Sequence, residues 1–279
     1  KFIPSSVAPL CDDARVTAIW TPDPARTKVV ARALDIPWAM CRSDDAVGKV
    51  DAVLSSDDSC EQWEDRNASW AMPYIAAGTP AFLDKPLSHS TREAFEVVDL
   101  AREKGAPILS CSGFRFSEAV RSQRRNMETL GDIVGADGAG PLGWLIFYGV
   151  HVIDPLVSMI GIGAQWVQHT GSPGNHLVVV GYDRARTVCF RSAAMAYGFH
   201  FSLFGSDGTA RFSIHPDEPE IAQERFHVET VRAAVEMFRT GRMPVSYEEQ
   251  LEVALILTGA KASMESGGKR IDLSDLRPH

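Results

Sequence analysis

The amino-acid sequence predicts an α/β chain of two domains. The first is a parallel sheet flanked by helices, and the second is an α+β domain with a mainly antiparallel sheet. Its 279 residues are more than one typical core needs and suit two. In the first half, short apolar runs alternate with amphipathic helical stretches, a rhythm typical of parallel sheets. In the second half, apolar runs follow one another across short turns, which favours antiparallel pairing.

The first half alternates strands with helices. Apolar runs predict strands at residues 16–20, 51–55, 81–83 and 107–111. Helices are predicted between them, at residues 24–34, 68–77 and 91–104. Asp23 and Pro24 open the first helix, because proline is tolerated in a first turn. Ser90 and Glu93 form a capping box at the start of the third helix, which Gly105 ends.

The second half contains strands and two closing helices. Strands are predicted at residues 178–180, 188–190 and 199–204, and helices at residues 224–239 and 247–265. The change of rhythm places the domain boundary near Ser112, so the first domain spans residues 1–111 and the second spans residues 112–279. We expect the C-terminal helix to pack back on the first domain.

Composition and charge disfavour several classes of protein. The net charge of −8 argues against a nucleic-acid binder, which needs a basic face. No apolar run reaches the roughly 18 residues of a membrane span, and no signal peptide is recognised. The five cysteines are scattered without a C-x-x-C pair, which disfavours a disulfide framework or a metal site and favours the cytoplasm.

The segment Asp84-Lys85-Pro86 follows the predicted strand at residues 81–83. In an open parallel sheet, ligands bind outside the carboxyl ends of the strands. A lysine there can donate to a substrate oxygen, and a proline can fix the turn, a cis bond being one way to do so. The alternative interpretation is a surface lysine at a strand end.

A second segment runs from Gly149 to Asp154 and includes His151. His151 and Asp154 are three residues apart, so they share one face of a helix start. A histidine titrates near neutrality and can take a hydroxyl proton while hydride leaves the same carbon. The alternative is a structural histidine whose ring bonds a backbone group.

In this order, the two segments resemble the Gfo/Idh/MocA oxidoreductases, named for glucose–fructose oxidoreductase and inositol dehydrogenase. Members carry a Glu-Lys-Pro turn after a Rossmann strand and a Gly-x-His-x-x-Asp segment in the second domain. Four further segments resemble the family, at residues 101–105, 115–117, 204–209 and 268–271. The resemblance therefore covers nearly the whole chain.

The resemblance implies a Rossmann-like domain for NAD or NADP and a second domain whose sheet faces the nicotinamide. Lys85 would hold the reacting oxygen, His151 would be the general acid/base, and Asp154 would orient the histidine or bind a substrate hydroxyl. The candidate cofactor-binding residues are Thr21, Arg26, Ser55, Ser56, Asp84 and Lys85. The candidate substrate-binding residues, with packing or a surface salt bridge as the alternative, are Arg115, Trp144 and Tyr148. Members usually pair through the exposed sheet face, so we expect a homodimer or homotetramer.

The nucleotide-binding half departs from the family pattern. No Gly-x-Gly-x-x-Gly precedes residues 16–20, so the first strand and glycine loop are missing. Because the chain begins with Lys1, we interpret this as a trimmed sequence. Thr21 stands where an acid usually meets the ribose, which leans toward NADP with Arg26 as the phosphate partner. The loop at residues 56–60 is more acidic than in other members.

The second domain departs at two places. Phe147 stands four residues before His151, where many members have an aspartate. The segment at residues 131–143 is short and glycine-rich, where members often hold an extra strand. We expect this reduced segment to open the substrate pocket or change an oligomer contact.

The leading hypothesis is an NAD(P)-dependent dehydrogenase or reductase that moves hydride to or from a sugar, inositol or related polyhydroxy compound. Phe147 and the acidic loop motivate an alternative, a catalytically silent NAD(P)-binding regulator of the same fold. A third possibility is an NAD-dependent non-redox glycosidase of this family.

Overall fold

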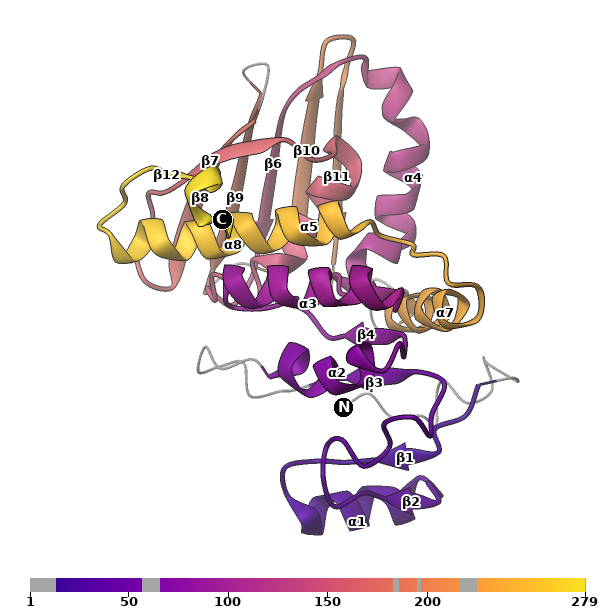
Figure 1. The fold of residues 1–279 in the computed structure, drawn as a ribbon. Helices are drawn as coiled ribbons and strands as arrows, with labels where there is room; N and C mark the ends of the chain where they lie inside the picture. The colour runs from indigo at the N-terminus through magenta and orange to yellow at the C-terminus, as the bar shows by residue number, and fades with distance from the viewer. Residues whose placement is uncertain (1–13, 57–65, 183–185, 195–196, 216–224, 279) are drawn as a thin grey trace.

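The first domain is a small α/β unit (Figure 1). The computed structural model describes residues 14–56, 66–182, 186–194, 197–215 and 225–278. The elements of this half, in chain order, are β1 (Ala18–Ile19), α1 (Pro24–Ala33), β2 (Trp38–Ala39), β3 (Val53–Ser55), α2 (Asn67–Ala76), β4 (Ala81–Leu83), α3 (Thr91–Lys104) and β5 (Ile108–Leu109). Strands β1 and β2 pair in parallel, as do β3, β4 and β5. In the described residues these two groups form separate sheets.

Helices α1 and α3 begin at residues whose side chains cap them. The Asp23 carboxylate accepts from the backbone N–H of Ala25, with Pro24 in the first turn. Ser90 accepts from the backbone N–H of Glu93 at the start of α3, and Gly105 ends that helix with φ of 63°. The reciprocal half of the predicted capping box is absent, because the Glu93 carboxylate accepts from Ser88 instead.

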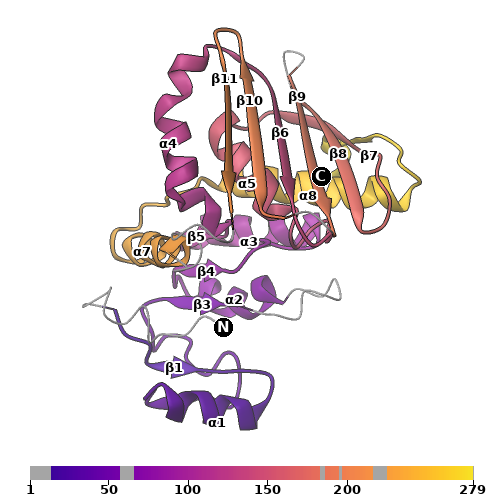
Figure 2. The same cartoon turned by 180° about the vertical axis from the view of Figure 1, so that it is seen from behind.

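The second domain is a seven-stranded sheet in the order β11-β10-β6-β9-β8-β7-β12. Its strands are β6 (Ile133–Gly140), β7 (Ala164–His169), β8 (Asn175–Tyr182), β9 (Thr187–Ala193), β10 (Phe199–Gly205), β11 (Thr209–Ile214) and β12 (Ile271–Asp272). All neighbours pair antiparallel except β6 and β9. Helices α5 (Val150–Ile160) and α8 (Tyr247–Glu265) lie against one face, and Figure 2 shows the other face from behind.

The glycine-rich segment at residues 131–143 corrects an expectation. It forms the eight-residue strand β6 inside the sheet rather than a reduced loop. Glycine is required there because α5 lies so close. A Cβ at Gly138 would come within 2.4 Å of one Val152 methyl carbon, and one at Gly140 within 2.8 Å of the other. Close packing of α5 therefore outweighs the poor intrinsic strand preference of glycine.

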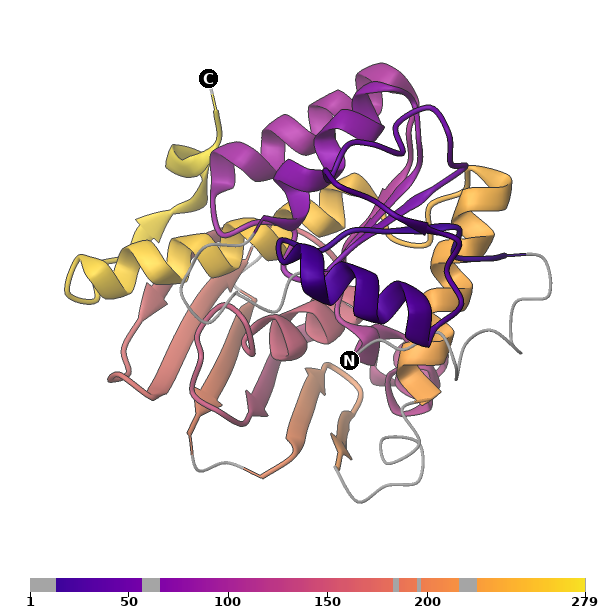
Figure 3. The same ribbon diagram turned by 90° about the horizontal axis from the view of Figure 1, so that it is seen from below.

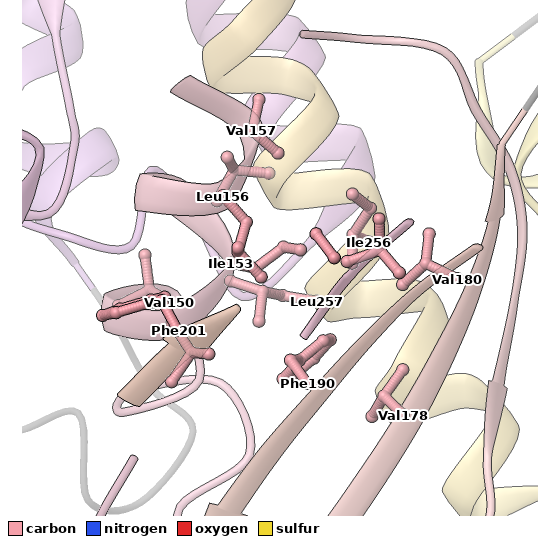
Figure 4. Close-up of a cluster of buried hydrophobic side chains, with 14 of the residues drawn as sticks. Val150, Ile153, Leu156, Val157, Val178, Val180, Phe190, Phe201, Ile256 and Leu257 are labelled. Carbon is pink, nitrogen blue, oxygen red and sulfur yellow. The ribbon is translucent and has the colours of Figure 1, made fainter. Parts of the chain in front are cut away.

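The main core lies between the sheet, α5 and α8 (Figure 4). Its labelled side chains come from α5, β8, β9, β10 and α8, and they are Val150, Ile153, Leu156, Val157, Val178, Val180, Phe190, Phe201, Ile256 and Leu257. Burying each large apolar side chain contributes about 1.5–3 kcal/mol. No helix in the described part of the chain is long and apolar enough to cross a membrane.

Helix α8 lies between the two domains. Figure 3 shows it between α3 and the strands of the second sheet, both of which it contacts. Leu251 and Ala254 pack into the first-domain core, while Ile256 and Leu257 pack into the main core. The middle of α8 is therefore buried on opposite sides, which explains why its apolar residues form a continuous run rather than one stripe.

Candidate active site

The carboxyl ends of β3 and β4 are tied together by Asp84. Its backbone N–H donates to the Ser55 carbonyl at 2.8 Å, which continues the parallel pairing by one residue. Its carboxylate accepts from the Ser56 hydroxyl at 3.1 Å and from the Lys85 backbone N–H at 2.9 Å. Three of the predicted cofactor-binding residues therefore meet Lys85 at one edge of the sheet, as expected of strand ends in an open parallel sheet.

Asn67 belongs to the same edge and was missed by sequence reasoning. It is the first residue of α2 and is 1% exposed. Its amide N–H donates to the Asp84 carbonyl, and its amide oxygen accepts from the Ser55 hydroxyl, both at 3.4 Å. A buried asparagine at a helix start next to a strand end was the available signal, because a buried amide needs polar partners.

Lys85 reaches across to the second domain. The Lys85–Pro86 peptide bond is cis, as the turn interpretation anticipated. The Lys85 ammonium lies 3.1 Å from the centroid of the Phe147 ring, a cation–π contact. Phe147 therefore presents its aromatic face to this lysine.

His151 stands in the first turn of α5. Its Nδ1 lies 2.8 Å from the Ser112 hydroxyl, and its ring lies 5.2 Å from that of Phe114 and 5.6 Å from that of Tyr148. Burial lowers the pKa of His151 well below 6.5, and the charges of Lys85 and His227 lower it further. The ring is therefore neutral at physiological pH and can accept a proton.

Asp154 is held by an arginine and not by His151. Its carboxylate accepts from Arg115 Nη2 at 2.7 Å and from the Ser112 backbone N–H at 2.9 Å. Arg115 Nη1 also donates to Glu249 of α8 at 2.8 Å. Arg115 and Asp154 are each 2% exposed, so this structure places neither on the surface of a substrate pocket. Burial alone would lower the pKa of Arg115, but the adjacent Asp154 raises it above its usual value.

Trp144, Phe147 and Tyr148 form a continuous aromatic wall beside His151. The ring centroids of Trp144 lie 5.9 Å from Phe147 and 5.7 Å from Tyr148, and those of Phe147 and Tyr148 are 5.6 Å apart. Trp144 is 41% exposed, so part of the wall is open to a ligand. Partial burial raises the pKa of the Tyr148 hydroxyl, which therefore stays protonated at neutral pH.

Thr21 and Arg26 lie at a different strand end, after β1. The Thr21 hydroxyl donates to the Asp23 carbonyl at 2.8 Å and lies 2.8 Å from the Thr27 hydroxyl, so it is bonded within its own turn. Arg26 is exposed on α1. In Figure 1 these elements lie below β3 and β4, on the side away from the second domain. Most of the acidic loop, at residues 57–60, falls outside the described residues.

Comparison with known proteins assigns the first domain. A family model described as "Oxidoreductase family, NAD-binding Rossmann fold" matches residues 5–111. The model is that of the Gfo/Idh/MocA family. The predicted Rossmann-like parallel sheet and mainly antiparallel second sheet are thereby confirmed as its fold.

Solved structures share the fold over the whole chain at low sequence identity. A probable dehydrogenase from Thermotoga maritima is 17% identical, with a TM-score of 0.81 over 97% of this chain and 96% of that one. The scyllo-inositol dehydrogenase from Lactobacillus casei with bound NAD(H) and scyllo-inositol is 14% identical, with a TM-score of 0.83 over 97% and 94%. The myo-inositol 2-dehydrogenase from Lactobacillus plantarum is 14% identical, with a TM-score of 0.78 over 93% and 91%. No curated protein matches the sequence.

Proposed function

We propose that this Gfo/Idh/MocA protein is an NAD-dependent dehydrogenase or reductase of a sugar, inositol or related polyhydroxy compound. The observation that carries the proposal is the approach of Lys85, from the first domain, to the rings around His151, from the second. Burial is the main cause of the lowered pKa of His151, and the charge of Lys85 adds to it because the ammonium lies near the imidazole. Inositol dehydrogenases share the fold, and one of them binds NAD(H) and scyllo-inositol.

The polar groups at the strand ends fit the nicotinamide half of a dinucleotide. Ser55, Ser56, Asn67 and Asp84 place hydroxyl, amide and carboxylate groups beside Lys85, the donor and acceptor set that a ribose diol and a carboxamide need. We assign them to that half of the cofactor. The bound cofactor would supply the hydride acceptor or donor.

We assign the adenosine half of the cofactor to the end of β1, where Thr21 and Arg26 are the candidate binding residues. The lean toward NADP rested on these two residues alone. The internal bonding of the Thr21 hydroxyl and the NAD-binding description of the family support NAD instead. Arg26→Ala should therefore leave the Kd for NAD within about threefold, since an exposed arginine without a phosphate partner contributes little.

The roles of the side chains follow from their charge and position. Lys85 would donate a hydrogen bond to the reacting oxygen and stabilise negative charge on it. Neutral His151 would take the hydroxyl proton during oxidation and return it during reduction. Trp144 and Tyr148 would pack against the C–H face of the substrate ring, which suits a cyclic polyol or sugar. Buried Arg115 and Asp154 would hold the backbone at Ser112 and the start of α5 in place.

The test is nicotinamide absorbance during incubation of the purified protein with NAD and a panel of sugars and inositols. We expect turnover on at least one compound, and a kcat lower by about 100-fold or more in Lys85→Ala and His151→Ala. Lys269→Ala and His200→Ala remove an exposed lysine and an exposed histidine that make no hydrogen bond, ion pair or ring contact with Lys85 or His151 in the described residues, and they serve as matched controls. Wild-type turnover in both site variants would refute the assignment.

Phe147 supports one second candidate, a regulator that binds NAD without catalysis. The usual acid beside the histidine is absent, which removes a partner for a charged imidazole. This alternative predicts NAD binding by calorimetry with no turnover on any compound of the panel. Release of nitrophenol from a nitrophenyl glycoside without net NAD reduction would instead identify the non-redox glycosidase.

The open face of the second sheet supports a homodimer or homotetramer. Val179 and Cys189 are paired neighbours on this face, and both are only half-buried in the single chain. Val134, 55% exposed on β6, adds a further apolar side chain. A second copy would cover these apolar groups, as exposed apolar patches commonly require. The scattered cysteines favour the cytoplasm, the net charge of −8 argues against nucleic-acid partners, and we expect no membrane partner.

A further inference from the structure

Ser112 connects the His151 ring to buried polar groups in the interior of the protein. It follows β5 and is 0% exposed, and its hydroxyl lies 2.8 Å from His151 Nδ1. Its backbone N–H donates to the Asp154 carboxylate at 2.9 Å. The two atoms of one serine therefore join the histidine to the buried Arg115–Asp154 ion pair, although Asp154 itself makes no direct hydrogen bond to the ring in the described residues.

We infer that Ser112 is the positioning residue of His151: its hydroxyl fixes Nδ1 and so leaves Nε2 as the nitrogen that meets the substrate. This inference rests on the proposed dehydrogenase function for its kinetic consequences. The position of the ring can be measured without any turnover, so it can be tested separately.

The hydrogen bonds of Ser112 suit this role. The Phe114 backbone N–H donates to the Ser112 hydroxyl oxygen at 3.3 Å, which fixes the direction of one lone pair. Nδ1 is the other partner of that oxygen in the described residues. A hydroxyl can donate to an unprotonated Nδ1 and can accept from a protonated one. The hydrogen bond between Ser112 and Nδ1 can therefore persist both when Nε2 carries a proton and when it does not.

The choice of serine agrees with the surroundings of the ring. Phe147 supplies no charge where an acid would stabilise a charged imidazole, and Ser112 also carries none. The ring is packed between Phe114, Tyr148 and Phe199. These contacts restrict the translation of the ring. Flat apolar contacts do not, however, distinguish the observed ring orientation from one rotated by half a turn, in which Nδ1 and Nε2 point the other way. The Ser112 hydroxyl makes that distinction.

The first experiment records the ring ¹⁵N resonances of histidine-labelled protein without substrate. In the wild type we expect the His151 Nδ1 resonance to be displaced by its hydrogen bond and the ring N–H to exchange slowly with water. In Ser112→Ala we expect that displacement to be lost and the exchange to be faster. Ser110→Ala is the matched control, because Ser110 is also buried, lies two residues away, and has a hydroxyl without a hydrogen-bond partner in the described residues. Unchanged His151 resonances in Ser112→Ala would overturn the inference.

The second experiment is steady-state kinetics on the substrate that the panel identifies. Ser112→Ala should lower kcat by about 10–100-fold, as misplacement of a catalytic group does, with KM changed by less than about threefold. Ser112→Cys keeps the volume and a weak donor, so it should fall between wild type and alanine and provides the test if the alanine variant does not fold. Equal kcat values in the Ser110 and Ser112 variants would refute the role. Absence of turnover in wild type would refute the proposed function while the ¹⁵N result still decides the inference.

Discussion

At the scale of single residues, the buried ion pair of Arg115 and Asp154 is the strongest electrostatic feature of the site. It joins the 3-10 turn at residues 113–116 to α5, and Glu249 extends it to α8. Removing one partner of such a pair leaves a buried charge without compensation, which costs far more than losing an exposed pair.

Asp154→Ala should therefore destabilise the protein by about 3–5 kcal/mol, measured as the free energy of unfolding in urea. The matched control is Glu248→Ala, which breaks the exposed ion pair between Arg102 of α3 and Glu248 of α8. This variant should lower the free energy of unfolding by at most about 1 kcal/mol. Equal losses in the two variants would show that burial does not set the strength of these ion pairs.

Residue identities at the site could be predicted only where a local motif marked them. Lys85 and His151 stand in short recognisable segments. Arg115 was interpreted as a substrate ligand because a sequence does not reveal that its carboxylate partners stand 39 and 134 residues away. Asn67 and Ser112 were missed for the same reason, since both act through contacts between segments that are distant in sequence.

At the scale of elements, sequence patterns located two long helices. The helix predicted at residues 247–265 from its apolar pattern is confirmed as α8, and the one predicted at residues 91–104 from its capping signals is confirmed as α3. The strand β6 could not be predicted because its glycines lack the side chains from which periodicity is read. Their function is visible only against α5.

Gly138→Ala tests that packing. The added Cβ would lie 2.4 Å from Val152 and 3.1 Å from Leu156, so α5 or β6 must shift. We expect a loss of about 1–3 kcal/mol in the free energy of unfolding. Gly208→Ala is the control, because its nearest neighbour would be 3.6 Å away. A Gly138 variant as stable as the control would show that α5 does not need glycine beneath it.

The pairing of β7 and β8 includes two buried histidines. His169 Nε2 lies 3.0 Å from His176 Nδ1, and burial lowers the pKa of both rings. The folded state therefore disfavours protonation. The contribution of the pair to stability is complete above about pH 6.5, the unfolded pKa, and is lost progressively as the pH falls below it.

We therefore expect the free energy of unfolding to fall between about pH 6.5 and pH 5, measured by urea titration across that range. His176→Gln should reduce this slope, with buried His151 contributing to what remains, whereas His200→Gln, at an exposed position on β10, should leave it unchanged. An unchanged slope in His176→Gln would assign the pH dependence to other groups.

At the scale of the whole molecule, the two-domain α/β architecture followed from the alternation of apolar runs. The arrangement of the domains around α8 could not be predicted, because a continuous apolar run shows that a helix is buried but not which elements pack on each of its sides. The proposed self-association is the prediction that belongs to this scale, since it concerns a face that α5 and α8 leave open.

Val179→Asp places a charge in the middle of that face and should convert the expected oligomer to a monomer, measured by light scattering at micromolar concentration. Val29→Asp is the control, because Val29 is 64% exposed on α1, away from the sheet. A wild-type monomer, or an oligomer that survives Val179→Asp, would exclude this face as the contact.

Helix α8 has a consequence for how the molecule comes apart. Near its start, Gln250 accepts from the Ser110 backbone N–H and donates to the Ile108 carbonyl; near its end, the Ser263 hydroxyl accepts from the His169 backbone N–H. Neither the β3–β4–β5 sheet nor the seven-stranded sheet can lose its order without releasing a helix that the other also requires. Heating should thus produce a single calorimetric transition whose van't Hoff and calorimetric enthalpies agree, with both halves melting as one cooperative unit.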